Sequence, residues 1–205
     1  MRGRRADPCE GAGSLGTASR LEFPDSQGLF FACGGSRYMT LLVISDTHGR
    51  RDRVQELLRL HREAEAVLFL GDGLRDLPEE PCSSDRPRLF AVSGNCDPFS
   101  LGGSSLGEEA LLTFGSYRFL LMHGHRHSVK SGTERAVTYA SARGADVLLF
   151  GHTHVREERY LPHDEGGKPM WVFNPGSLGA PADGEPSYGL IQIRGGQLLF
   201  SHGSL

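Results

Sequence analysis

The sequence predicts an α/β protein in which two β-sheets pack together and helices lie outside them. In the first half of the chain, continuous apolar runs typical of strands buried on both faces alternate with a helical pattern. The second half is richer in strand-like segments and carries hairpin signals. The length of 205 residues suits one domain with a tail.

The first half contains three predicted strands and one predicted helix. Thr40–Ser45 and Ala66–Leu70 are apolar throughout, and Leu89–Ser93 forms a third such run. Between the first two strands, Arg51–Ala64 places apolar residues at helical spacing with charges on the opposite face. This strand–helix–strand order favours a parallel sheet with right-handed crossovers.

The second half predicts a hairpin, a helix and four further strands. The hairpin strands Ala110–Phe114 and Tyr117–Met122 flank a Gly-Ser turn, and Thr133–Arg143 suits a helix. Asp146–Phe150 is another buried strand. The remaining predicted strands are Met170–Phe173, Tyr188–Ile193 and Gln197–Phe200.

Residues 1–38 differ from the rest of the chain because they show no sustained helical or strand period. Their longest apolar run, Leu29–Cys33, is too short for the core of a signal peptide. We expect a disordered tail here, with a functional arm as the alternative, and one domain over residues 39–205. Met39 directly precedes the first predicted strand, so a native start there would make the tail an artefact of start-site choice.

Composition excludes several classes of protein. The formal net charge of −3 gives no signal for a general nucleic-acid binder. No apolar run approaches the roughly 20 residues that span a bilayer, so we expect no membrane segment. The cysteines form no CxxC pair and are too sparse for a disulfide framework, which favours a cytoplasmic protein. They are Cys9, Cys33, Cys82 and Cys96.

Seven side chains able to bind a metal follow predicted strands, each in a turn that contains glycine. They are Asp46, His48, Asp72, Asn95, His123, His152 and His154. Open α/β sheets place their sites at such strand ends. A single Asp or His there is usually a turn residue, but the recurrence argues against coincidence. Imidazole with carboxylate suits Mn, Fe, Zn or Ni, and two such ions sharing a carboxylate promote in-line phosphoryl displacement.

The ordered motifs DxH (46–48), GD (71–72), GN (94–95), HGH (123–125) and GHTH (151–154) resemble the calcineurin-like metallophosphoesterase superfamily. The chain is most similar to its YfcE-like phosphodiesterase subgroup, over roughly Met39 to the C-terminus. Asn174-Pro175-Gly176-Ser177 also resembles that subgroup. The resemblance implies a four-layer αββα sandwich with the site at the sheet edge.

The resemblance also implies the division of the ligands between two ions. Metal one is expected at Asp46, His48, Asp72 and His154, and metal two at Asp72, Asn95, His123 and His152. Asp72 is therefore expected to bridge, and a metal-bound hydroxide to act as nucleophile beside Asp72, Asn95 and His123. The family implies Mn²⁺ first, with Ni²⁺, Zn²⁺ or Fe²⁺ also compatible. A small phosphodiester is the expected substrate, and a homo-oligomer stays open.

Cys96 departs from the pattern of many superfamily members, which carry a histidine at this place to protonate the leaving group. A thiol is a poor acid at pH 7, so we expect a preference for activated phosphodiesters with good leaving groups. The alternative is that Cys96 is a small buried apolar residue. The neighbouring Asp97 is expected to hydrogen-bond to backbone within the turn.

Other residues near the motifs have plainer interpretations. His125 and His127 are expected to be loop residues, with substrate contact as the alternative. Arg126 and Lys130 are expected to be solvated charges, or to hold a second phosphate substituent. Residues 174–177 are expected to form a Pro-Gly turn that shapes the pocket. Ordinary surface or helix-face histidines are expected at His61, His163 and His202.

The leading function predicted from these residues is a metal-dependent phosphodiesterase. One alternative is a phosphomonoesterase of the same superfamily, whose members usually keep the missing histidine. A second is a non-catalytic scaffold, like the retromer subunit of this fold with its degraded metal site. All seven ligand positions here carry competent residues, which favours the enzyme. A nuclease would need a basic groove, which the net charge does not support.

Overall fold

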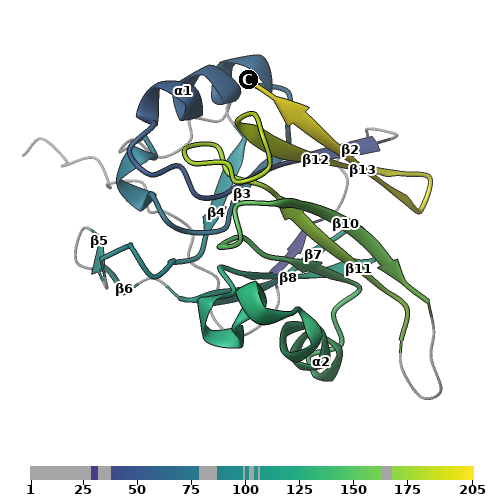
Figure 1. The fold of residues 1–205 in the computed structure, drawn as a ribbon. Coiled ribbons are helices and arrows are strands. Elements are labelled where there is room, and N and C mark those ends of the chain that lie inside the picture. The colour runs from purple at the N-terminus through teal and green to yellow at the C-terminus, as the bar shows by residue number, and fades with distance from the viewer. Residues whose placement is uncertain are drawn as a thin grey trace, which may run out of the picture.

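Two mixed β-sheets stacked face to face form the centre of this protein (Figure 1). The computed structural model describes residues 29–31, 38–78, 87–98, 100–101, 104–105, 107–162 and 168–205. The five-stranded sheet runs β13 (Gln197–Ser204), β12 (Ser187–Arg194), β2 (Tyr38–Ile44), β3 (Ala66–Phe69), β4 (Arg88–Ala91). The six-stranded sheet runs β1 (Leu29–Phe31), β7 (Glu109–Phe114), β8 (Tyr117–Met122), β9 (Val147–Leu149), β11 (Met170–Pro175), β10 (Arg156–Leu161).

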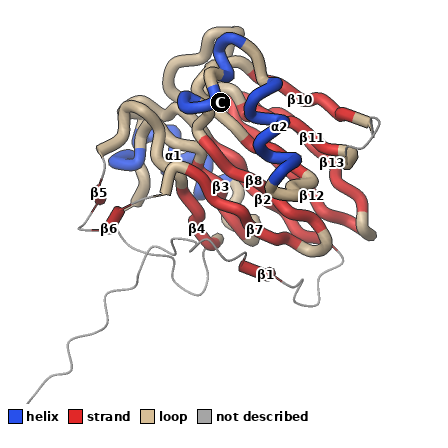
Figure 2. The backbone as a smooth tube through the Cα atoms, turned by 90° about the horizontal axis from the view of Figure 1, so that it is seen from below, coloured by secondary structure: helices blue, strands red, loops and turns tan. Residues whose placement is uncertain are grey.

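Helices cover the outer faces of the two sheets. α1 (Arg51–Leu60) packs on the five-stranded sheet, and α2 (Glu134–Ala142) packs on the six-stranded sheet. Short 3₁₀ helices η1 (Leu74–Asp76), η2 (His125–His127) and η3 (Val129–Ser131) follow β3 and β8. The small ribbon of β5 (Ser100–Leu101) and β6 (Ser104–Ser105) lies apart from both sheets (Figure 2). None of the described helices is long and apolar enough to cross a membrane.

The core follows from the two-residue period of the buried strands. In β2, Leu41 and Val43 face the other sheet, whereas Leu42 and Ile44 face α1. Each of these side chains is fully buried, and such burial stabilises the fold by about 1.5–3 kcal/mol per residue. The apolar runs of the sequence therefore belong to strands covered on both sides, which gives the order helix, sheet, sheet, helix.

The αββα sandwich predicted from the sequence is confirmed, and the differences lie at the edges. The helix predicted over Arg51–Ala64 ends at Leu60, because His61 takes the capping position and leaves helical dihedrals. Strand β10 is missing from the prediction because its charged sequence REERYL suits an exposed edge, which it occupies next to β11. Leu29–Phe31, inside the segment expected to be disordered, pairs in parallel with β7. Residues 1–28 and 32–37 of that expected tail lie outside the described residues.

The parallel strands of both sheets determine where their loops meet. β2, β3 and β4 are mutually parallel, so their carboxyl ends share one edge of the five-stranded sheet. β8 and β9 are likewise parallel, and their carboxyl ends share one edge of the six-stranded sheet. The two edges adjoin, since His152 N after β9 donates to Asp46 Oδ2 after β2. Within the six-stranded sheet, Gly151 N after β9 donates to His123 O after β8.

Candidate metal centre

All seven ligands predicted from the sequence lie in loops at this common edge. The five-stranded sheet provides Asp46 and His48 after β2, Asp72 after β3 and Asn95 after β4. The six-stranded sheet provides the other three. These are His123 after β8 and His152 and His154 after β9. Residues more than 100 positions apart in the chain thus become neighbours.

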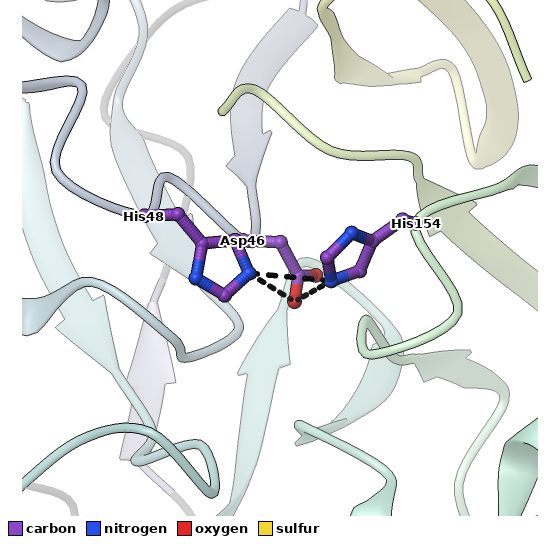
Figure 3. A group of neighbouring side chains, drawn as sticks. All are labelled: Asp46, His48 and His154. Atoms are coloured by element: carbon purple, nitrogen blue, oxygen red, sulfur yellow. Dashed lines mark hydrogen bonds and ion pairs between the residues drawn. The ribbon is translucent and has the colours of Figure 1, made fainter. Parts of the chain in front are cut away.

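One cluster consists of Asp46, His48 and His154 (Figure 3). Their ligand atoms all lie within 4.8 Å of one another, and both rings converge on the Asp46 carboxylate. Asp46 Oδ1 is 3.1 Å from His154 Nε2 and 3.8 Å from His48 Nε2. The two Nε2 atoms are 3.2 Å apart.

A second cluster consists of Asp72, His123 and His152, whose ligand atoms also lie within 4.8 Å of one another. His123 Nε2 is 3.3 Å from Asp72 Oδ2 and 3.2 Å from His152 Nδ1. Asn95 joins this cluster, with its Oδ1 atom 3.2 Å from His123 Nε2. Asp46 Oδ1 lies 3.9 Å from the same nitrogen, so the two clusters adjoin.

The donor set fits a cation because lone pairs face one another inside the clusters. His123 Nδ1 lies 2.8 Å from Leu70 O, and His154 Nδ1 lies 2.6 Å from Ala180 O. A carbonyl oxygen only accepts, so each Nδ1 carries a proton, and the neutral form of each ring turns an Nε2 lone pair inward. Among the described residues, the buried Asp46 Oδ1 has no hydrogen-bond partner. Metal-ligating histidines typically donate their other ring N–H to a carbonyl in this way.

Backbone strain is concentrated at these ligands. Among the described residues, six non-glycine residues have positive φ, and five of the six are candidate ligands. These five are Asp46 (53°), His48 (42°), Asp72 (59°), His152 (69°) and His154 (60°). Each such conformation costs of order 1–3 kcal/mol and persists only where surrounding contacts determine it. The loops are therefore held in shape by their neighbours.

Two motif glycines permit close approach between the ligand loops. A Cβ at Gly94 would lie 2.1 Å from Asp72 Oδ1, and one at Gly151 would lie 2.0 Å from Ser45 Oγ. Any side chain at either position would displace the neighbouring loop. The glycines of the GN and GH motifs thus allow their loops to lie close to the neighbouring ligand loops.

In each cluster, the closeness of an aspartate and a histidine shifts the pKa values of the side chains. Burial raises the pKa of Asp72, but the neighbouring His123 and the main-chain N–H of Cys96 outweigh it and hold that pKa well below its usual range. Burial lowers the pKa of His123, whereas Asp72 raises it more, so the net shift is upward. The pKa of His154 is raised by the Asp46 carboxylate beside it. Burial, with the nearby charge of His123, lowers the pKa of His152 to about 4.

Cys96 lies at the edge of the site and is exposed, which contradicts the alternative of a buried apolar residue. Its main-chain N–H donates to Asp72 Oδ1 at 2.7 Å, and its Sγ accepts from Asn95 Nδ2 at 3.2 Å. The second contact leaves Asn95 Oδ1 turned towards His123. Partial burial, together with Asp72, raises the pKa of the Cys96 thiol.

The other described histidines, Arg126 and Lys130 lie in different parts of the structure. His125 and His127 lie in η2 rather than in an irregular loop, and the His125 ring centroid is 5.5 Å from that of His123. Arg126 pairs with Glu108, and Lys130 is exposed on η3. His61 and His202 contact rings of Tyr188 and Phe173, whereas His163 lies outside the described residues.

Asn174 and Ser177 have a larger role than the predicted turn. Asn174 Nδ2 donates to Gly151 O at 3.2 Å and to Thr153 Oγ1 at 3.0 Å, on either side of His152. Ser177 Oγ donates to the main-chain oxygen of Asp46 at 2.8 Å. Both side chains are fully buried, so this segment supports the loops of His152 and Asp46 from inside the protein.

Asp76 is a supporting residue that the sequence did not reveal. Its Oδ2 accepts from the Thr47 hydroxyl and, at 2.8 Å, from Gly49 N, on either side of His48. Its only signal in the sequence was its place four residues after Asp72. That signal is too weak to distinguish it from a solvated charge.

Comparison with known proteins supports the family resemblance and the fold expected from the sequence. Residues 39–196 match the family model of the calcineurin-like phosphoesterase superfamily domain. The probable metallophosphoesterase YsnB of Bacillus subtilis is 36% identical over 146 residues, covering 70% of this chain and 77% of that protein. The phosphodiesterase YfcE of Escherichia coli is 29% identical over 180 residues, covering 75% and 87%.

Solved structures show the same fold. A predicted phosphoesterase of Streptococcus pneumoniae superposes with a TM-score of 0.65 at 24% identity, covering 82% of this chain and 90% of that chain. Vacuolar protein sorting 29 of Cryptosporidium parvum superposes with a TM-score of 0.58 at 19% identity, covering 82% and 99%. At these identities the likeness concerns architecture alone.

Proposed function

Because this chain belongs to the calcineurin-like phosphoesterase superfamily, we propose that it is a phosphodiesterase that works with two divalent metal ions. The observation that carries this proposal is the convergence of ligand lone pairs on a buried carboxylate oxygen, Asp46 Oδ1, that lacks a hydrogen-bond partner among the described residues. The resemblance to a named phosphodiesterase supports the choice of a diester substrate.

The proposed division of ligands follows the two clusters. Asp46, His48 and His154 would hold one ion, and His123, His152 and Asn95 the other. Asp72 would be shared, because one of its oxygens faces His123 and its carboxylate also lies in a group with His48. When bound, such ions polarise a phosphoryl oxygen and activate water near neutral pH. We propose Mn²⁺ first, with Ni²⁺, Zn²⁺ and Fe²⁺ also suited to this nitrogen and oxygen donor set.

The protein's own residues orient the reaction and limit its range. The main-chain N–H of Cys96 fixes one oxygen of Asp72, and the Leu70 and Ala180 carbonyls fix the two rings that they contact. No imidazole stands at the place of Cys96, so the leaving group must depart with little help from an acid there. We propose that good leaving groups are therefore preferred.

The test compares bis-p-nitrophenyl phosphate with p-nitrophenyl phosphate on metal-stripped protein that is given Mn²⁺. Faster diester cleavage that requires Mn²⁺ is expected, and Asp72→Asn should lower it by at least about 1000-fold because the shared ligand is weakened. Faster monoester cleavage would instead identify a phosphomonoesterase.

A non-catalytic scaffold is the second candidate, because the fold is shared with vacuolar protein sorting 29. Folded protein that turns over neither substrate with Mn²⁺, Ni²⁺ or Zn²⁺ would favour this candidate. The complete set of seven ligands favours the enzyme.

A further inference from the structure

The Asp97 carboxylate accepts four main-chain hydrogen bonds. Its Oδ2 accepts from Asp72 N at 2.7 Å and from Gly94 N at 2.9 Å. Its Oδ1 accepts from Gly73 N at 2.8 Å and from Leu74 N at 2.9 Å. Only the bond to Gly94 lies within the turn of Asp97 itself. The other three reach a loop more than 20 residues away.

These bonds join the two loops that carry Asp72 and Asn95. Asp72 has a left-handed backbone with φ 59°, and its neighbour Gly73 has φ 143°. Successive N–H groups in such a turn point to one side and form a concave anion site, which the Asp97 carboxylate fills. The two loops already lie in close contact where Asp97 joins them, because a Cβ at Gly94 would lie 2.1 Å from Asp72 Oδ1.

We propose that Asp97 is the positioning residue that places Asp72 to be shared by the two metal ions. This inference rests on the proposed metal centre. Asp97 offers the ions no ligand atom, because both of its oxygens are turned to backbone. It acts by fixing the turn of Asp72 and the spacing between Asp72 and Asn95. Such supporting residues typically change metal affinity by about 10- to 100-fold.

Asp76 provides a matched comparison because it supports a different loop in a similar way. Its carboxylate holds Thr47 and Gly49 around His48, which the proposed division assigns to one ion only. The short helix η1 lies between these two supporting residues. Its first residue, Leu74, donates its N–H to Asp97, and its last residue is Asp76 itself. Loss of Asp97 should therefore disturb both ions, whereas loss of Asp76 should disturb mainly one.

The experiment measures Mn²⁺ binding by calorimetry and electron paramagnetic resonance for the wild type, Asp97→Asn, Asp76→Asn and Asp52→Asn. In Asp97→Asn, the introduced amide would keep one acceptor and turn an NH₂ group towards backbone donors. We expect two ions with a spin-coupled spectrum in the wild type. Asp97→Asn should bind both ions about 10- to 100-fold more weakly and lose the coupled spectrum. Asp76→Asn should weaken one ion, and Asp52→Asn, which changes an exposed partner of Arg50, should match the wild type.

The outcomes separate this inference from the proposed function. A wild type that binds no Mn²⁺ refutes the metal centre itself. A wild type that binds two ions, with Asp97→Asn equal to it in affinity and spectrum, overturns the role of Asp97. Equal loss of both ions in Asp76→Asn also overturns it, because general loosening would then suffice. If Asp97→Asn fails to fold, as judged by circular dichroism, Asp97→Ser carries the same prediction, since its smaller side chain admits water to the freed N–H groups.

Discussion

The five-stranded and six-stranded sheets contribute different chemistry to the same site. Every candidate oxygen ligand comes from the five-stranded sheet, in the loops after β2, β3 and β4. The six-stranded sheet contributes imidazoles alone, namely His123, His152 and His154. His48 is the one candidate imidazole on the oxygen-rich side.

The two sides also hold their ligands by different means. Asp and Asn side chains are short, so the backbone of their loops must come close to the metal site. The N–H groups of these loops donate to the carboxylates of Asp76 and Asp97, which hold the loops in place. Histidine reaches further, and its ring is oriented by a single bond from Nδ1 to a carbonyl, as at His123 and His154. A change on the oxygen side therefore moves backbone, whereas a change on the imidazole side mainly removes one ligand.

Among changes that compare the two sides, the largest effect is expected from removing one imidazole on each. His48→Ala and His152→Ala should each reduce bound Mn²⁺ from two ions to one per chain, because each histidine belongs to a different cluster. Diesterase activity should fall by at least about 100-fold, since each ion contributes several kcal/mol. Metal analysis after gel filtration and the diester assay measure both quantities. Two ions retained in both variants would contradict the division of the ligands.

Metal binding should stabilise the protein, and the gain should depend on pH. Excess Mn²⁺ at about 100 times its dissociation constant should add about 2.7 kcal/mol to the free energy of unfolding. The pKa values of His123 and His154 are raised, so both rings gain protons as pH falls and their Nε2 atoms stop being ligands. At one fixed Mn²⁺ concentration, the stabilisation should therefore be larger at about pH 8 than at about pH 6, near the ordinary pKa of histidine. Thermal unfolding with and without Mn²⁺ measures it, and an equal gain at both pH values would contradict the argument.

The sequence predicted the central strands and the ligand loops because both are local patterns. An apolar run that ends in a glycine turn with Asp or His identifies its own strand end, as at Asp72 after β3. Strands without that pattern were missed, such as β10 with its charged sequence and β1 within the expected tail. Their pairing depends on neighbours that are distant in the chain.

The bond of Asp97 within its own turn was predicted, but the other supporting contacts could not be predicted for the same reason. Ser177 bonds the main chain of Asp46 across 131 positions, and Asp76 bonds Thr47 across 29. A polar residue in a Pro-Gly turn or beside a short helix has many ordinary uses. Only the packing of the two sheets shows which backbone group each one meets. The turn predicted at 174–177 was therefore assigned too small a role.

Asn174→Ala tests how the imidazole side is supported. The change removes the amide that donates to Gly151 O and to Thr153 Oγ1, on either side of His152. We expect a loss of about 1–3 kcal/mol in the free energy of unfolding, the usual cost of freeing buried polar groups. Mn²⁺ affinity should fall mainly for the ion that His152 holds. Urea unfolding and calorimetry measure these effects, with Asp52→Asn as the exposed control. An unchanged affinity would show that the His152 loop keeps its shape without Asn174.

Cys96→His adds an imidazole to the oxygen-rich side, and we expect the smallest effect on activity from this change. Cys96 is exposed beside Asp72, so an imidazole there has room to reach the leaving group. Hydrolysis of alkyl phosphodiesters should rise by about 10-fold or more, because a positioned imidazole supplies the acid that a thiol supplies poorly. Hydrolysis of bis-p-nitrophenyl phosphate should rise less, since p-nitrophenolate leaves without a proton. Cys96→Ser, which removes the thiol without adding an acid, should show no gain on alkyl esters. If Cys96→His also shows none, Cys96 does not account for the preference for good leaving groups, and the limit lies in how the loops position the substrate.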